Sequence, residues 1–164
     1  MQRVAPAEEA RFVQMAREDG IPHFAIRTLA PHAGDRFVIR YLEPMTNNEA
    51  AIGLDIASEA ARREAALASA RSGQATLSRP ITLVQEAGSA RHGFLLLLPV
   101  YRDGAPADTE DARWQATRGW AYAALNIDAV LERPEHTDRL YDLALSDAGE
   151  DARRGPFYAS ADFS

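Results

Sequence analysis

The chain has 164 residues, of which 46% are hydrophobic and 26% charged, a balance typical of a compact folded domain rather than of a disordered or coiled-coil protein. Its 18 basic residues are all arginine and are outnumbered by 24 acidic residues, and the net charge of −6 argues against nucleic acid as a partner. The sequence has no cysteine for disulfides or thiolate metal sites, no signal-peptide pattern, and no apolar run near the about 20 residues of a membrane span.

The first 43 residues are predicted to form a helix followed by two strands. Residues 6–19 start with a proline in the first turn and carry apolar residues on one face, the pattern of a short helix that ends at Gly20. The segments 23–29 and 36–43 are rich in β-forming residues and are joined by a turn-like connection. They predict a hairpin or two neighbouring strands.

The middle of the chain predicts a second helix and two further strands. The helix has Ser58 as its N-cap, is rich in alanine, and stops at Gly73. Residues 81–86 and 94–102 predict antiparallel strands, and the second is so apolar that we expect it in the centre of the sheet. Pro99 marks where that strand should end or bulge.

The last third of the chain gives weaker signals. Residues 103–118 are interpreted as a polar connection, 119–127 as a strand and 128–133 as a short helix. A final strand within 140–149 is expected to pair with residues 157–160. This order of elements predicts an α+β fold in which helices flank an antiparallel sheet, compatible with a PAS-like sensor.

The carboxylate of Asp55 lies between two apolar residues, Leu54 and Ile56, just before a predicted helix. An ionised side chain drawn toward an apolar surface needs a partner. From the residues alone three roles stay open for Asp55. It caps a helix, it pairs with Arg62 or Arg63, or it binds a ligand.

Motifs of the common catalytic and metal sites are absent from the sequence. The four histidines lack metal-binding spacing, and there is no nucleophile elbow, phosphate loop or dinucleotide fingerprint. Two acidic clusters, at 108–111 and 147–151, are interpreted as solvated loops because neither has the spacing of a calcium loop. We therefore expect no enzyme activity, no metal and no cofactor.

The run from Tyr41 to Arg102 resembles the CHASE domain, the cyclase and histidine-kinase associated extracellular sensory module. The matching pieces are YLEP with the asparagine pair after it, the G-x-D step that ends at Asp55, the Arg-Arg-x-x-Ala helix, SRPITLVQE and GFLLLLPVY. FVQMAREDG upstream and GWAYAALNIDAVL downstream extend the resemblance to about residues 11–132. The joint order of these pieces is more specific than any one of them.

The resemblance implies a non-catalytic, ligand-binding sensor in a receptor with a histidine kinase, nucleotide cyclase or diguanylate cyclase as its output. In the plant cytokinin receptors the module is a long stalk helix followed by two PAS-like subdomains, and the membrane-distal one binds an adenine-type hormone. Residues 1–20 are then expected to be a remnant of the stalk helix, 21–132 the distal subdomain and 133–164 part of the proximal one. The chain would be a periplasmic or extracellular piece of a membrane-tethered, homodimeric receptor.

The resemblance also implies ligand-binding residues. Asp55 is similar to the aspartate that binds the adenine ring, Leu77 matches a position that lines the same pocket, and Leu97 falls where those receptors carry a threonine. The ligand is expected to be adenine-like or a small apolar acid. Because Leu97 lacks the hydroxyl, the site is expected to differ from that of the plant hormone and to take a more apolar or a different molecule. Aromatic walls are expected from Tyr41, Phe94, Tyr101, Trp120 and Tyr122.

Two other classes of function stay open at this stage, and each makes a structural prediction. A small-molecule sensor should have an enclosed cavity that touches Asp55. A periplasmic protein-interaction module without a small ligand should instead have a flat, exposed apolar patch. A small hydrolase or lyase should have a histidine within hydrogen-bond reach of Asp55 in an open cleft.

Overall fold

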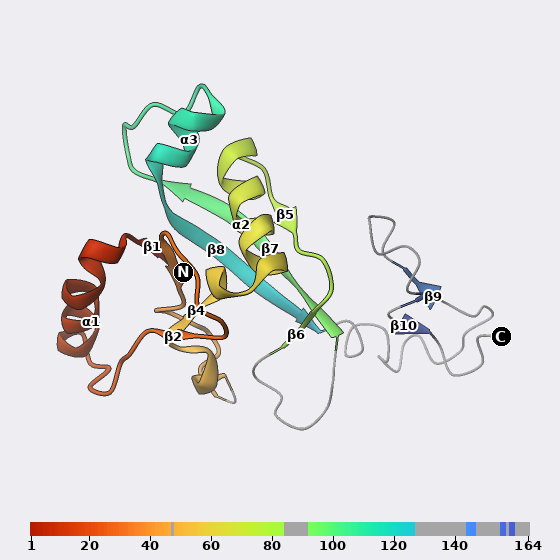
Figure 1. The fold of residues 1–164 in the computed structure, drawn as a ribbon, viewed down its shortest axis with the longest axis horizontal. Helices are drawn as coiled ribbons and strands as arrows, with labels where there is room; N and C mark the ends of the chain where they lie inside the picture. Colours follow the sequence, from red (N-terminus) through yellow and green to blue (C-terminus); the bar gives the residue numbers. More distant parts are fainter. Residues whose placement is uncertain (47, 84–91, 127–143, 147–154, 157, 160–164) are drawn as a thin grey trace.

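The computed structural model describes residues 1–46, 48–83, 92–126, 144–146, 155–156 and 158–159 (Figure 1). Within these ranges the chain is an α+β protein, as predicted. Its α-helices there are α1 (Glu9–Glu18), α2 (Ala60–Ser72) and α3 (Glu110–Ala116). In the described ranges no helix combines the length and the apolar character that crossing a membrane requires.

One mixed sheet holds most of the described strands. Its spatial order is β2-β4-β3-β1-β8-β7-β5, and β6 also pairs with β7. The strands are β1 (Gln2–Val4), β2 (Arg27–Thr28), β3 (Arg36–Val38), β4 (Leu54–Asp55), β5 (Thr76–Leu77), β6 (Ile81–Thr82), β7 (His92–Tyr101) and β8 (Thr117–Asn126). Neighbouring strands are antiparallel except β2 and β4, which are parallel.

Helix α2 covers one face of the long hairpin formed by β7 and β8 (Figure 1). The side-chain hydrogen bonds that join them are Trp120 Nε1 to the Ala66 carbonyl (3.0 Å), Ser69 Oγ to the Leu97 carbonyl (3.2 Å) and the Tyr101 hydroxyl to the Ala70 carbonyl (2.8 Å). The alanines of α2 let the helix approach the sheet closely, and the larger core residues come from the sheet side. A second apolar cluster lies under α1.

Both helices predicted in the first half of the chain are confirmed. Residues 6–19 contain a 3₁₀ turn, η1 (Pro6–Glu8), followed by α1. Helix α2 ends as predicted at Gly73, whose φ of 76° is the left-handed conformation that glycine adopts at helix ends. The N-cap of α2 is Glu59 rather than Ser58, because the Glu59 carboxylate accepts hydrogen bonds from the first backbone N–H groups of the helix.

The predicted pairing of segments 23–29 and 36–43 is wrong. Strand β4 lies between β2 and β3, parallel to the first and antiparallel to the second. Backbone bonds hold it there, including Arg27 N to the Gly53 carbonyl at 2.8 Å and Ile39 N to the Leu54 carbonyl at 3.0 Å. A two-residue strand is too short to produce a period-2 pattern, so β4 could not be predicted from the sequence.

Two further elements were not predicted. Strand β1 lies in the middle of the sheet, between β3 and β8. Helix α3 forms inside the segment 103–118 that the sequence suggested was a polar connection, and Thr109 caps it by accepting a hydrogen bond from Ala112 N at 3.1 Å. Its first turn includes two members of the acidic cluster at 108–111, where carboxylates favour the helix dipole.

The ladder between β7 and β8 continues past Pro99, and its irregularity comes between Val100 and Tyr101. In the described part of the chain β5 reaches only Leu96 and Leu97, so Pro99 has a strand partner on one side. Proline tolerates such an edge position because its missing N–H costs no ladder hydrogen bond there.

The C-terminal predictions are partly testable. Strands β9 (Ala144–Leu145) and β10 (Tyr158–Ala159) pair antiparallel, which confirms the expected partnership of these two segments. The short helix expected at 128–133 and the acidic cluster at 147–151 lie outside the described residues. The division of the chain at residues 20 and 132 stays a prediction.

Gly119 brings β1 and β8 into close contact and supplies a test of the sheet order. A Cβ at this position would lie 2.2 Å from the Met1 carbonyl oxygen, which is backbone and cannot rotate away. We expect Gly119→Ala to destabilise the fold by at least about 2 kcal/mol in urea unfolding. Ala121→Ser, at an exposed position of the same strand, should change stability by less than about 0.5 kcal/mol. Equal stability of the two variants would contradict the central position of β1.

Candidate functional site

Asp55 is the last residue of β4, and its side chain is fully buried. Its Oδ1 accepts hydrogen bonds from two backbone amides, Phe37 N in β3 at 2.8 Å and Ala57 N at 3.0 Å. The second bond caps the 3₁₀ turn η3 (Ile56–Ser58), which leads into α2. One carboxylate oxygen therefore ties β3 and the entrance of α2 to β4.

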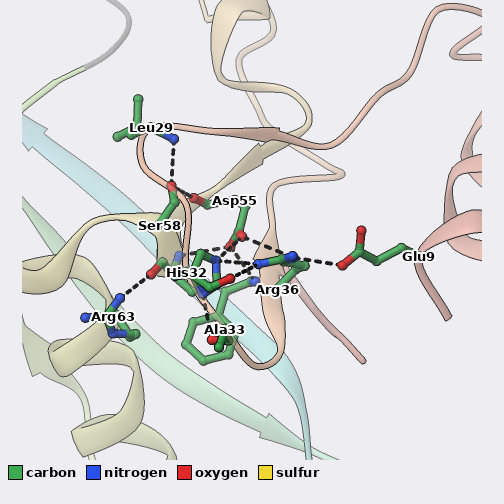
Figure 2. Close-up of polar contacts among 10 residues, drawn as sticks. Glu9, Leu29, His32, Ala33, Arg36, Asp55, Ser58 and Arg63 are labelled. Carbon is green, nitrogen blue, oxygen red and sulfur yellow. Dashed lines mark hydrogen bonds and ion pairs between the residues drawn. The ribbon is translucent and has the colours of Figure 1, made fainter. Parts of the chain in front are cut away.

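The second oxygen of Asp55 faces basic side chains (Figure 2). His32 Nε2 lies 2.6 Å from Oδ2, and Arg36 Nε lies 3.9 Å from the same atom. Arg36 Nε in turn donates to Glu9 Oε1 in α1 at 2.8 Å. We call Glu9, His32, Arg36 and Asp55 the Asp55 network; it joins α1 to β3 and β4.

The arginines predicted as partners of Asp55 bind backbone carbonyls instead. Arg62 Nη2 donates to the Thr82 carbonyl at 2.6 Å, and Arg63 Nη1 to the Ala57 carbonyl at 2.8 Å. Arg36 and His32 occupy the place beside Asp55 because β3 and the loop before it run alongside β4. This pairing could not be predicted from the sequence, since it depends on the order of the strands.

A histidine does lie within reach of Asp55, but both side chains are buried. The side chain of His32 is 8% exposed and that of Asp55 is 0% exposed. General acid-base catalysis needs access for a substrate as well as hydrogen-bond geometry. The arrangement therefore gives no support to a hydrolase or lyase. Among the described residues there is also no cluster of three or more His, Cys, Asp or Glu that could hold a metal ion.

An apolar cavity lies on the α2 side of the sheet. Its walls come from β4, β6, β7, β8, α2 and the segments next to them, and the lining residues are Ile39, Ala51, Leu54, Ile56, Arg62, Ile81, Leu83, Leu95, Tyr122 and Ala124. The space open to the centre of a water-sized sphere is about 20 Å³, which is room for about one water molecule. We refer to it as the α2 cavity.

Asp55 is not one of the residues that line the α2 cavity, although both of its chain neighbours, Leu54 and Ile56, do. The apolar neighbours thus face the cavity, while the carboxylate makes its contacts with β3 and the loop that holds His32. Direct contact between Asp55 and a ligand stays a prediction.

The other residues expected at the site lie in different environments. Tyr122 lines the α2 cavity, and Leu97 is fully buried in the same core. Phe94 is buried as well. Leu77 is 51% exposed and Tyr41 is 60% exposed. The structure therefore brings Tyr122 and Leu97 into one layer and leaves Leu77 and Tyr41 at the surface.

Tyr122 and Arg62, two residues of the cavity wall, carry buried polar groups. The sequence did not indicate that these two residues lie in the same wall. The Tyr122 hydroxyl is buried without a hydrogen-bond partner in the described part of the chain. Arg62 is 4% exposed and forms no ion pair within that part. Leaving such a hydroxyl unpaired costs about 1–3 kcal/mol, and an unpaired buried charge costs more.

Burial shifts the titration of both groups. It raises the pKa of the Tyr122 phenol to about 12, so the hydroxyl keeps its proton at physiological pH. It also lowers the pKa of Arg62, an effect that the nearby Glu59 carboxylate partly offsets. A guanidinium remains charged under these conditions, since its ordinary pKa is above 12. The residues of the cavity wall therefore include one cation and one neutral donor.

Comparison with known proteins gives one match. The model of the CHASE domain family matches residues 1–158 of the chain. None of the curated proteins compared with the chain matches it.

Loss of the Asp55 charge should destabilise the protein. Asp55→Asn removes the charge from the network and replaces one acceptor oxygen by a donor, so we expect a loss of about 1.5–3 kcal/mol in urea unfolding. The matched control is Glu64→Gln, because Glu64 pairs with Arg79 at 2.7 Å on the exposed surface. That change should cost less than about 1 kcal/mol. Similar losses for both variants would show that the Asp55 network is not a stabilising element.

Replacement of tyrosine by phenylalanine should affect stability differently at Tyr122 and at Tyr101. Tyr122→Phe removes a hydroxyl that has no partner, so the thermal midpoint of the unliganded protein should stay constant or rise. Tyr101→Phe removes the hydrogen bond to the Ala70 carbonyl and should lower stability by about 0.5–1.5 kcal/mol. A clear loss of stability for Tyr122→Phe would mean that its hydroxyl has a structural partner.

Proposed function

The chain belongs to the CHASE domain family, whose members are extracellular, non-catalytic sensory domains of signalling receptors, and on that basis we propose that it binds a small molecule and reports its presence across the membrane. The receptor would carry a histidine kinase or a diguanylate cyclase as its output. It would be a membrane-tethered homodimer in which residues 1–20 continue a stalk helix, 21–132 form the distal ligand-binding subdomain, and 133–164 begin the proximal one.

The α2 cavity is the observation that supports ligand binding best. It is apolar, it lies between the sheet and a helix, and its lining residues include the buried Arg62 and Tyr122, whose hydroxyl has no hydrogen-bond partner in the described part of the chain. Ligand sites are commonly apolar pockets with a few polar groups that fix orientation. Because the cavity holds only about one water molecule, a ligand has to move part of its wall on entry.

The Asp55 network gives this movement a route to α1. Leu54 and Ile56 form part of the cavity wall, and Asp55 between them connects through Arg36 to Glu9 at the start of α1. A ligand that displaces β4 would therefore shift the balance of contacts that hold α1. Such coupling requires that the ligand favour one of two arrangements of this network. In this account Asp55 transmits the movement of the cavity wall.

One observation favours a second function. The face of β7 opposite α2 exposes Leu96, Leu98 and Val100, and Leu77 of β5 pairs in register with Leu96. These side chains are 40–51% exposed and form an apolar stripe. Such a stripe suits a periplasmic interaction module that binds a protein instead of a small molecule.

Neighbouring positions on β8 distinguish the two functions. Ala124 lines the α2 cavity, whereas Ala123 pairs with Leu96 in register and belongs to the opposite face. We expect a panel of purines, cytokinin-type adenines, amino acids and short acids to contain a compound that raises the thermal midpoint of the parent chain. At 100 times its dissociation constant that compound adds about 2.7 kcal/mol of stability.

Ala124→Leu should abolish this response because its side chain fills the cavity, and Ala123→Leu should retain it. A response that Ala123→Leu removes and Ala124→Leu keeps would move the binding site to the exposed stripe. The absence of any response, combined with binding of a protein partner that Ala123→Leu weakens, would support the interaction module.

A further inference from the structure

Arg62 carries a positive charge into the wall of the α2 cavity. It lies in the first turn of α2, and Nη2 donates to the Thr82 carbonyl at 2.6 Å, which fixes one edge of the guanidinium. The nearest acidic residue in sequence, Glu59, uses its carboxylate oxygens for the backbone amides of Ala61 and Arg62. Within the described residues no carboxylate lies within ion-pair distance of the guanidinium. In the part of the chain that the structure describes, the Arg62 guanidinium therefore has no ion-pair partner, and the Glu59 carboxylate acts on it only from beyond ion-pair distance.

Tyr122, another residue of the cavity wall, supplies a second polar group without a partner among the described residues. Its hydroxyl is buried, forms no hydrogen bond in the described part of the chain, and keeps its proton. The guanidinium of arginine can only donate hydrogen bonds, and a phenol donates strongly to an anion. The two polar groups of the cavity thus both suit a ligand that accepts hydrogen bonds and carries negative charge.

The rest of the lining limits the shape of that ligand. Every other residue of the wall has an aliphatic side chain, with Leu54, Ile81 and Leu83 among them. Among the described residues, the lining of the cavity includes no carboxylate that could accept hydrogen bonds from the N–H groups of an adenine, because Asp55 lies outside it and has protein partners at both oxygens. The aliphatic wall favours a ligand with an apolar body and a single polar end.

From these observations we propose that the α2 cavity recognises a small apolar monocarboxylate, which Arg62 binds through its carboxylate and Tyr122 orients by donating a second hydrogen bond. This inference rests on the proposed function of the cavity as the ligand site. It makes Arg62 and Tyr122 the residues that determine ligand class. The carboxylate supplies the missing counterion, and the aliphatic wall encloses the hydrocarbon part.

Matched acids and amides test the inference directly. Isovalerate, hexanoate and benzoate are titrated against the 164-residue chain by thermal unfolding and calorimetry, beside isovaleramide, hexanamide and benzamide. At least one acid should bind, and its amide, which has the same shape without the charge, should bind at least about 30-fold more weakly. Equal binding of acid and amide would overturn the inference.

Variants of Arg62 and Tyr122, each with a matched control, test whether these two residues bind the acid. Arg62→Gln should weaken binding of the acid at least about 30-fold, whereas Arg63→Gln, at the neighbouring arginine that also donates to a backbone carbonyl, should change it less than about threefold. Tyr122→Phe should weaken it about tenfold and Tyr101→Phe should not. If Arg62→Gln does not fold, the loss of acid binding in Tyr122→Phe still tests the inference.

The outcomes separate this inference from the proposed function. A neutral compound that stabilises the chain and loses its effect in Ala124→Leu, with no acid binding, would overturn the carboxylate assignment and leave the cavity as the sensor site. An acid that binds equally to the parent chain and to Arg62→Gln would also overturn the assignment. If neither acids nor neutral compounds bind, both the assignment and the cavity as the sensor site are overturned.

Discussion

The buried carboxylate of Asp55 is the interaction on which the arrangement of this domain depends. A charge without access to water is stable only when its oxygens have partners, and here two backbone amides and a histidine supply them. These partners come from β3, from η3 and from the loop before β3. The two-residue strand β4 is thus held by a side chain as well as by its ladder. Arg36 extends the contact to Glu9 of α1.

The position of Asp55 also defines the α2 cavity. With the carboxylate directed toward β3 and His32, the apolar residues on either side of it face the opposite way and form part of the cavity wall. Within the described residues, Asp55 has protein partners at both oxygens, whereas the Arg62 guanidinium has no ion pair and the Tyr122 hydroxyl has no hydrogen bond. Unpaired buried groups lower stability, and proteins commonly retain such a cost at functional sites.

The sequence predicted the features that depend on local patterns. The helix at 6–19, the end of α2 at Gly73 and the long apolar strand β7 were all visible, because capping residues and composition act over a few neighbouring positions. The resemblance of the Tyr41–Arg102 run to CHASE domains predicted the family that the comparison then showed. Strands β1 and β4 could not be predicted from the sequence, because segments of two or three residues show no periodicity and form strands only through pairing with distant segments.

The candidate site was less predictable for the same reason. Asp55 stood out as a charge among apolar residues, and the residues alone left its partner undetermined. His32 and Arg36 become its neighbours only through strand order. Arg62 was visible in the sequence as part of the Arg-Arg step, but the absence of an ion pair at its guanidinium within the described residues is a property of the packed structure. Leu77 and Tyr41 are at the surface because the side-chain direction in short strands and loops depends on tertiary contacts.

Methyl NMR during a titration with hexanoate tests the central claim, that the α2 cavity is the ligand site, most directly. The account predicts saturable shifts of the methyl groups of Leu54, Ile56 and Leu83, which line the cavity, and constant positions for those of Leu77, Leu96 and Leu98 on the exposed face. Shifts confined to the exposed leucines, or no saturable shift of the cavity methyls, would contradict it.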